Sequence, residues 1–404
     1  MICQDVVLVR YGEITLKDSW TRQNWERILA GNIAFSLNRA GISHKMERGE
    51  GRIFVHTSDC RASRIAADVF GTVSASPAQT VASDLQEICR AAVDLAGRAG
   101  LCGLSGLCSQ PDQSGLNQSD LKYHAPHSFA IRPRRSGVSF TSEQIGRTVG
   151  QAVQSSTGAS VNLDRPDTEI FVEARRDRTF IFTDVIKGVG GLPLGSQGRM
   201  LALISGGIDS PVAAWMMMKR GCPVTLLHFD SRPYADAISQ SMSCAEALSQ
   251  WTSGRKIDFI TVPISWAIEK ISSHYPKATC VLCRRLMYRI AAKIMADEGC
   301  LGIVTGYSMG QVASQTAENI LAEQAALGVP VYHPLIALDK TEITDLARKI
   351  GTYGISEETK SCTAVPKKPM TRAGKDEMAA AEELLGLVEI AGMLAREKTL
   401  TRIG

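Results

Sequence analysis

The second half of the chain alternates short apolar runs with helical stretches from Met200 onward. The apolar runs have the length of buried strands and lie at 201–204, 223–229, 259–262 and 302–305. Strands buried on both faces read as continuous apolar runs, and intervening helices supply the crossovers of a parallel sheet. The pattern therefore predicts an α/β domain in which a parallel sheet carries helices on both faces.

The composition is that of an ordinary globular protein. Of 404 residues, 44% are apolar and 21% charged, which excludes a fibrous or disordered chain and indicates two or three domains. The net charge of +4 says little about partners, so any nucleic-acid argument depends on local charge clusters. No signal peptide or membrane span is expected, and the 11 cysteines are irregularly spaced. We therefore expect a cytoplasmic protein whose thiols are free, metal-bound or catalytic.

The first half has a mixed α+β pattern. Strands are expected at 6–9, 52–55, 128–132, 169–174 and 179–184, and helices around 25–37, 62–70 and 142–155. Ser142 is the expected cap of the last helix. The stretch 100–120 is rich in Gly, Ser and Gln and reads as a loop insertion, in which Cys102 and Cys108 read as spare thiols. These patterns place domain boundaries near residues 60 and 190.

The segment Ser205–Ser210, with the sequence S-G-G-I-D-S, follows the first apolar strand of the second half. Its adjacent glycines let backbone N–H groups close around an anion, and its serines add hydroxyl donors. A helix is expected from Pro211, whose positive end favours phosphate. The Walker sequence is absent, so a phosphate site here belongs to another class. The alternative interpretation is a tight strand-to-helix turn that merely requires glycine.

The S-G-G-x-D-S loop resembles that of the PP-loop ATP pyrophosphatases, which adenylate a carbonyl oxygen and release pyrophosphate. Further motifs narrow the resemblance to the tRNA 4-thiouridine synthetase, or tRNA sulfurtransferase, family. They are Arg10–Lys17, the G-G-L-P-x-G linker within Gly188–Gly198, Gly306–Thr316 and His333–Lys340. The resemblance covers nearly the whole chain, with the motifs in the family's order.

The resemblance implies a multidomain α/β architecture. It comprises an N-terminal ferredoxin-like α+β domain (1–60), a THUMP RNA-binding domain (61–187, with insertion 100–120) and a PP-loop ATP pyrophosphatase domain (188–404). The implied reaction uses ATP and Mg²⁺ to adenylate the C4 oxygen of uridine 8 in tRNA and replaces that oxygen with sulfur. The rhodanese domain of many bacterial members is not found here. Sulfur would come from a cysteine desulfurase persulfide or inorganic sulfide; a homodimer and a secondary role in thiamine thiazole synthesis are further expectations.

The resemblance also assigns residues to the nucleotide. Those expected to bind ATP are Leu203, Ile204, Ser205, Gly206, Gly207, Asp209, Ser210, His228, Phe229, Arg284, Gly306 and Gln315. Asp209 is expected near the metal and pyrophosphate, and Lys340 is expected to stabilise charge during adenylation. Phosphoryl chemistry depends mainly on positioning and charge stabilisation, which an arginine and a lysine provide. The alternative for Arg284 and Lys340 is a solvated charge on a helix.

Basic residues gather in the THUMP-like region and again near Cys362. The candidate tRNA contacts are Arg132, Arg134, Arg135, Arg175, Arg176, Lys367 and Lys368. Arginine pairs well with phosphate, although a run of charge is also typical of a merely solvated face.

Three cysteines form a candidate sulfur site. Cys280 and Cys283 make a C-x-x-C at the start of a predicted helix, where their spacing places both thiols on one face beside Arg284. Cys362 matches the family's catalytic-loop cysteine. The three together resemble the arrangement of archaeal members, which implies a 4Fe-4S cluster with one open iron. The alternatives are a zinc site completed by Cys300 or Cys244, persulfide or disulfide chemistry, or inert thiols.

Three other function classes compete. An amide-forming synthetase would need an ammonia source, and the sequence has no amidotransferase-like segment. A THUMP-type methyltransferase would need a glycine-rich Rossmann turn, which is absent because Pro193 breaks the only candidate. A non-catalytic RNA-binding protein is disfavoured by the intact S-G-G-I-D-S loop.

Overall fold

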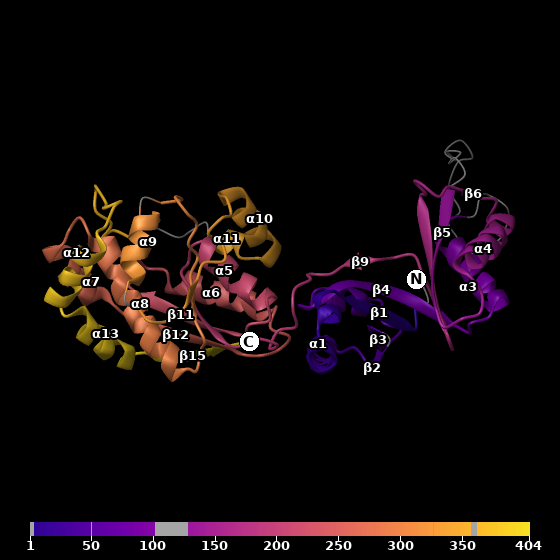
Figure 1. Ribbon diagram of the computed structural model, residues 1–404, viewed down its shortest axis with the longest axis horizontal. Helices are drawn as coiled ribbons and strands as arrows, with labels where there is room; N and C mark the ends of the chain where they lie inside the picture. The colour runs from indigo at the N-terminus through magenta and orange to yellow at the C-terminus, as the bar shows by residue number, and fades with distance from the viewer. Residues whose placement is uncertain (1–3, 50, 102–127, 313, 326, 357–361) are drawn as a thin grey trace, which may run out of the picture. The chain divides into compact units, whose positions relative to one another are not determined.

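The computed structural model describes residues 4–49, 51–101, 128–312, 314–325, 327–356 and 362–404 (Figure 1). Most of the predicted insertion, including Cys102 and Cys108, lies outside these residues. The chain divides into two compact units. The first comprises 1–11, 37–67 and 73–188, and the second comprises 12–36, 68–72 and 189–404.

The first unit is built on one sheet of nine described strands, in the order β2-β3-β1-β4-β8-β7-β5-β6, with β9 paired to β4. Their bounds are β1 (Val6–Tyr11), β2 (Lys45–Gly49), β3 (Arg52–His56), β4 (Thr72–Val81), β5 (Ser128–Ser136), β6 (Ser160–Val161), β7 (Thr168–Arg175), β8 (Thr179–Phe182) and β9 (Ile186–Lys187). The expected strands are present. Sequence reasoning missed β4, which joins the strands on either side of it into a continuous sheet.

Helices α2 (Arg61–Ala67), α3 (Leu85–Arg98) and α4 (Ser142–Thr157) complete this unit. Apolar residues of α3 and α4, such as Ile88 and Val149, are fully buried against the sheet. The expected cap Ser142 is wrong by one residue. Thr141 caps α4, because its hydroxyl accepts from the Gln144 backbone while the Gln144 side chain accepts from the Thr141 backbone.

The second unit contains a sheet of six described strands in the order β14-β13-β10-β11-β12-β15. Their bounds are β10 (Met200–Leu203), β11 (Val224–Asp230), β12 (Ile257–Pro263), β13 (Ile303–Val304), β14 (Val331–Tyr332) and β15 (Thr399–Ile403). The pairs from β14 to β12 are parallel, and β15 is antiparallel at the edge. The predicted parallel sheet is therefore confirmed, with one antiparallel edge strand that the sequence did not reveal.

Alternate residues of the central strands serve two cores, which explains their continuous apolar runs. Leu201 and Ile260 pack with α7, α8 and α13, whereas Leu226 and Phe259 pack with α5, α6 and α10. The helices of this region are α5 (Asp209–Lys219), α6 (Ile238–Ser249), α7 (Ser265–His274), α8 (Thr279–Asp297), α9 (Ala317–Gln324), α10 (Lys340–Ile350), α11 (Tyr353–Ser356), α12 (Lys375–Leu384) and α13 (Leu387–Arg396). A short 3-10 helix (Glu13–Leu16) and α1 (Ser19–Arg39) follow β1.

None of the helices within the described ranges combines the length and the apolar character needed to cross a membrane.

Candidate functional site

The S-G-G-I-D-S loop connects β10 to α5 and closes on itself through its two serines. The Ser210 hydroxyl accepts a hydrogen bond from the Ser205 backbone N–H at 2.8 Å and donates to the Ser205 carbonyl at 3.1 Å. Helix α5 begins at Asp209, two residues before the expected start at Pro211. The proline is tolerated there because the first-turn N–H groups have no partner within the helix. The loop therefore leads directly into a helix N-terminus, which favours an anion.

Gly306, in the loop after β13, packs directly against this helix N-terminus. A Cβ atom at position 306 would lie 2.8 Å from the backbone nitrogen of Ser210 and 2.9 Å from the carbonyl carbon of Asp209. Those contacts are with backbone, which cannot move aside without distorting the turn. The glycine is therefore required by close packing between the two loops.

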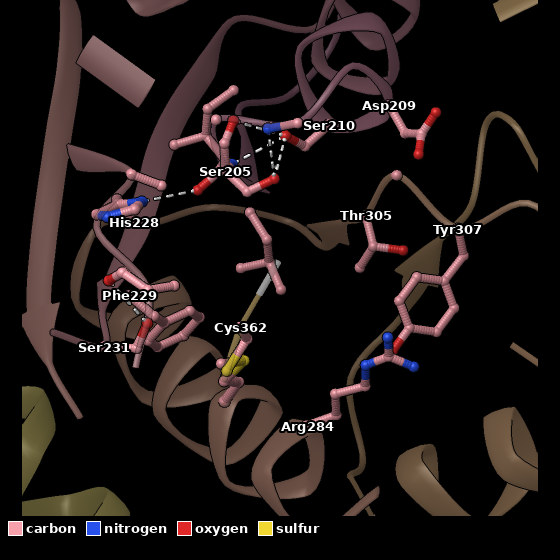
Figure 2. A pocket seen from close by; sticks show the side chains of 18 of the residues that line it. Ser205, Asp209, Ser210, His228, Phe229, Ser231, Arg284, Thr305, Tyr307 and Cys362 are labelled. Carbon is pink, nitrogen blue, oxygen red and sulfur yellow. Dashed lines mark hydrogen bonds between the residues drawn. The ribbon is translucent and has the colours of Figure 1, made fainter. Parts of the chain in front are cut away.

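A cavity of about 420 Å³ opens at the carboxyl ends of β10, β11 and β13. The chain leaves β10 toward β11 on one side and reaches β13 on the other, so the cavity lies where ligands typically bind in open parallel sheets. Every residue that the sequence assigned to ATP lines it: Leu203, Ile204, Ser205, Gly206, Gly207, Asp209, Ser210, His228, Phe229, Arg284, Gly306 and Gln315. Figure 2 shows Ser205 and Ser210 across the cavity from Arg284 and Cys362.

His228 is buried at the end of β11 and has a defined hydrogen-bonding state. Its Nδ1 lies 3.1 Å from the carbonyl oxygen of Ile204 and 3.1 Å from the hydroxyl of Ser241. Burial lowers the pKa of His228, so the ring is neutral at pH 7. Because the Ile204 carbonyl can only accept, Nδ1 carries the hydrogen and Nε2 is left as an acceptor.

Arg284, on α8, is held by a carboxylate that sequence reasoning missed. Its Nη1 lies 3.3 Å from Oε1 of Glu323, and its guanidinium lies 4.9 Å from the centre of the Tyr307 ring. The Tyr307 hydroxyl donates to Oε2 of Glu323 at 2.7 Å. Burial raises the pKa of Glu323 to about 7, against the opposing pull of Arg284 and Tyr307. Tyr307 lies within the family motif Gly306–Thr316, whereas nothing in the sequence distinguishes Glu323 from other helical glutamates.

Asp209 points away from the serine loop toward α10. Its Oδ1 accepts from Nζ of Lys340 at 2.7 Å, and its Oδ2 accepts from Nε2 of Gln311 at 3.3 Å. Lys340 and Gln311 also line a second, more open cavity of about 470 Å³. The predicted pair Asp209 and Lys340 is thus brought together at the side of the first cavity. Gln311 lies within the family motif Gly306–Thr316, but the sequence analysis did not predict it as a site residue.

Comparison with known proteins agrees with this architecture. Residues 195–387 match the family described as thiamine biosynthesis protein (ThiI), residues 6–76 the ThiI ferredoxin-like domain, and residues 117–184 the THUMP domain. A protein of Methanosarcina acetivorans named "Probable tRNA sulfurtransferase" is 44% identical over 96% of this chain and 91% of its own length. The chain belongs to the tRNA sulfurtransferase family.

Two more comparisons place it within that family. The "Probable tRNA sulfurtransferase" of Methanothermobacter thermautotrophicus is 38% identical over 99% of this chain and 98% of its own length. Among solved structures, "Crystal structure of a 4-thiouridine synthetase - RNA complex with bound ATP" matches with a TM-score of 0.83 and 28% identity. That match covers 99% of this chain and 100% of the solved one. The predicted membership and the predicted fold class are therefore both confirmed.

Cys362, the cysteine assigned by the family's catalytic-loop motif, lines the cavity itself. Cys280 and Cys283 lie one turn apart at the start of α8, on the face that also carries Arg284. Burial raises the pKa of the Cys283 thiol to about 12, and the thiols of Cys362 and Cys280 raise it further.

The structure bears on the alternative that Cys280 and Cys283 form a zinc site completed by Cys300 or Cys244. Within the described ranges, no group of three or more His, Cys, Asp or Glu side chains is arranged as a ready metal site. Cys244 is buried in a core and its sulfur contacts the Ser356 hydroxyl, while Cys300 is buried near Thr225. Neither core cysteine is placed to complete a zinc site with Cys280 and Cys283.

The predicted tRNA contacts differ in exposure. Arg134, Arg135 and Arg176 are exposed, and none pairs with a carboxylate among the described residues, whereas Arg132 is bound to Glu169 at 2.6 Å. Arg175 is buried and ion-paired with Glu173, which removes it from the surface that a nucleic acid reaches. Lys367 and Lys368 are exposed on the segment that follows Cys362.

Proposed function

We propose that this protein is an ATP-dependent tRNA sulfurtransferase that converts uridine 8 of tRNA to 4-thiouridine. The uridine C4 oxygen attacks the α-phosphorus of ATP, pyrophosphate leaves, and sulfur then displaces AMP, which carries that oxygen away. One observation supports the proposal most strongly. The residues expected to bind the nucleotide and the cysteine Cys362 line one and the same cavity at the S-G-G-I-D-S loop.

The cavity residues have distinct roles in this proposal. The pairs Leu203–Ile204 and His228–Phe229 flank the adenosine, and Ser205–Ser210 hold the phosphates. Arg284 neutralises phosphate charge, because Glu323 holds its guanidinium at the cavity wall. Lys340 lies close enough to the loop to stabilise the charge that develops on the departing pyrophosphate.

The carboxylate of Asp209, in the S-G-G-I-D-S loop, is a suitable ligand for Mg²⁺. Asp209 offers a partly exposed carboxylate beside the phosphate loop, and carboxylate oxygens combined with substrate phosphates are the usual ligands of Mg²⁺. Bound there, the ion would neutralise charge on the triphosphate. Lys340 now occupies one oxygen of Asp209, so the lysine is expected to turn toward the phosphates when the metal ion and ATP bind.

A 4Fe-4S cluster held by Cys280, Cys283 and Cys362 is our proposal for the sulfur site. Cys280, Cys283 and Cys362 offer three soft thiols, the donor type that such a cluster takes, although among the described residues they do not form a preformed metal site. Such a cluster would supply an open iron that binds sulfide. The protein's own part is to hold Cys362 at the cavity wall, next to the activated uridine. The sulfur donor is then inorganic sulfide or a desulfurase persulfide.

The remaining parts of the proposal concern the whole chain. Residues 1–60, 61–187 and 188–404 act as ferredoxin-like, THUMP and PP-loop domains, and the protein works in the cytoplasm. Homodimer formation and a secondary role in thiamine thiazole synthesis are carried by the family resemblance alone.

The function is tested with anaerobic protein, ATP, Mg²⁺, sulfide and unmodified tRNA. We expect 4-thiouridine at position 8, with AMP and pyrophosphate formed in step with it. A tRNA carrying cytidine at position 8 is the matched control and should yield neither product above background. If the protein binds tRNA but releases no pyrophosphate, it is a binding protein and the proposal fails.

Exposed arginines should make tRNA binding sensitive to salt. Replacing Arg134 and Arg135 together by Gln should lower the slope of log affinity against log salt by about 1 to 2 units, because each neutralised phosphate releases counterions. Filter binding or fluorescence anisotropy at several salt concentrations measures this.

The matched control replaces Arg61 and Arg90 by Gln. These arginines are also exposed and lie in the same unit, but they are paired with Asp59 and Glu87. The control removes the same charge and should leave the slope nearly unchanged. Equal slopes for both double variants would show that Arg134 and Arg135 belong to a merely solvated face.

A further inference from the structure

Helix α9 (Ala317–Gln324) connects two functional parts of the second unit. Immediately before it, Gln315 lines the ATP cavity, and Thr316 caps the helix through its hydroxyl. Asn319 and Glu323 lie four residues apart, on one face of the helix. Both side chains are buried, and each is bound to a different part of the site.

Asn319 binds the segment that follows Cys362. Its Nδ2 donates to the carbonyl of Met370 at 2.9 Å, and its Oδ1 accepts from the backbone N–H of Ala373 at 2.9 Å. Thr316 adds a second contact, because its hydroxyl donates to the carbonyl of Thr371 at 2.8 Å. An amide satisfied at both ends and buried at 0% exposure allows a single arrangement of the backbone it holds.

The same helix holds the nucleotide side of the cavity. Glu323 binds Tyr307 and Arg284, as described above. The carbonyl of Ser314 accepts from Nη1 of Arg284 at 3.4 Å and also from Nδ2 of Asn319 at 3.3 Å. One backbone carbonyl therefore joins the arginine at the ATP cavity to the amide that holds the cysteine segment.

The segment from Cys362 to Ala373 is fixed near both ends. At its start, the backbone N–H of Thr363 donates to the carbonyl of Tyr234 at 2.8 Å. At its end, Met370 is held by Asn319 and by the carbonyl of Lys277, 3.2 Å from its own backbone nitrogen. Several of these contacts join backbone to backbone. The side chains that hold the end of the segment near Met370 are those of Asn319 and Thr316.

We infer that Asn319 is a positioning residue that sets the Cys362 segment against the ATP cavity, so that uridine activation and sulfur delivery occur at one place. This inference rests on the proposed function, because it assigns the two half-reactions to the two parts of the site that Glu323 and Asn319 of α9 hold. Asn319 touches neither substrate. It acts through the backbone of Met370 and Ala373.

The test compares pyrophosphate release with 4-thiouridine formation in Asn319→Asp. The substitution keeps the size but replaces the donor to Met370 by an oxygen that repels its carbonyl. We expect pyrophosphate release to persist while the yield of 4-thiouridine per pyrophosphate falls by about tenfold or more. A displacement of about 1 Å at a reacting group can reduce a rate on the order of 100-fold.

Three further variants separate positioning from folding. Asn32→Asp makes the same change at another buried amide, one that donates to the carbonyl of Leu194 at 3.0 Å, and should keep the wild-type ratio. Thr316→Val should lower the ratio in the same direction, whereas Thr316→Ser restores the hydroxyl and should restore the ratio.

The outcomes are distinct. An unchanged ratio in both Asn319→Asp and Thr316→Val overturns the inference, as does a parallel loss of both products with the ratio preserved, which would indicate a structural role only. A failure of the proposed function appears instead in the wild-type protein, as the absence of both products before any variant is compared.

Discussion

Asp209→Asn is expected to reduce thiolation by on the order of 100-fold or more, with tRNA affinity unchanged. The carboxylate lies at the first position of α5, bound to Lys340 and Gln311, beside the loop that we propose for the phosphates. Its replacement removes the proposed Mg²⁺ ligand while retaining the shape of the side chain. Losses of this size are typical when one group that stabilises transition-state charge is removed. Single-turnover formation of 4-thiouridine measures the effect.

Asp258→Asn is the matched control. Asp258 lies on β12, has a similar exposed fraction of 22% against 26% for Asp209, and is ion-paired with Arg402 and Arg199. Surface ion pairs contribute about 0 to 1 kcal/mol, so both variants should unfold at nearly the wild-type temperature. Normal thiolation by Asp209→Asn would remove this carboxylate from the mechanism.

Cys362→Ser is expected to lose bound iron and thiolation together, the latter by at least about 100-fold. Changes to groups that only support a metal ligand already cost about 10- to 100-fold, so loss of a ligand should cost at least as much. Pyrophosphate release should continue, because the nucleotide residues are untouched. Anaerobic protein is examined for iron and sulfide content, for brown colour and for 4-thiouridine formation.

Cys60→Ser serves as the control, because Cys60 is an exposed free cysteine in the other unit. It should retain iron, colour and activity, and so should Cys102→Ser and Cys108→Ser. Colourless, iron-free wild-type protein that still thiolates tRNA would refute the cluster and leave persulfide transfer through Cys362. Retention of full iron by Cys362→Ser would exclude that residue as a ligand.

The fold could be predicted where strands are buried on both faces, and less well where proline interrupts them. The four apolar runs of the second half became β10 to β13, because their composition leaves few alternatives. Strand β4 was missed because Pro77 and two serines interrupt its apolar pattern. Strand β5 was expected to end at Arg132, yet it continues through Pro133 to Ser136, in parallel register with β7. Proline lacks a donor, so sequence rules favoured a turn there.

The site could be predicted as far as its motifs extend. The loop Ser205–Ser210 and the residues Arg284 and Gln315 came from recognisable sequence and line one cavity. Glu323 and Asn319 were not found, because a helical Glu or Asn carries no local signal of burial. Arg175 was grouped with exposed arginines, and only the fold reveals that it turns inward to Glu173. The burial of Glu323 and Asn319 depends on contacts with residues far away in the sequence, which local patterns do not show.

The shared sheet of the first unit limits how this protein can be divided. Strand β4 lies between β1 and β8, so the strands before and after it complete one another's hydrogen bonding. A fragment ending before Thr72, or one starting after Val81, would expose an unpaired edge in the middle of the sheet and invite aggregation. Gene fusions, truncations and recombination are therefore expected to keep strands β1 to β9 together, even though two named families describe this part of the chain.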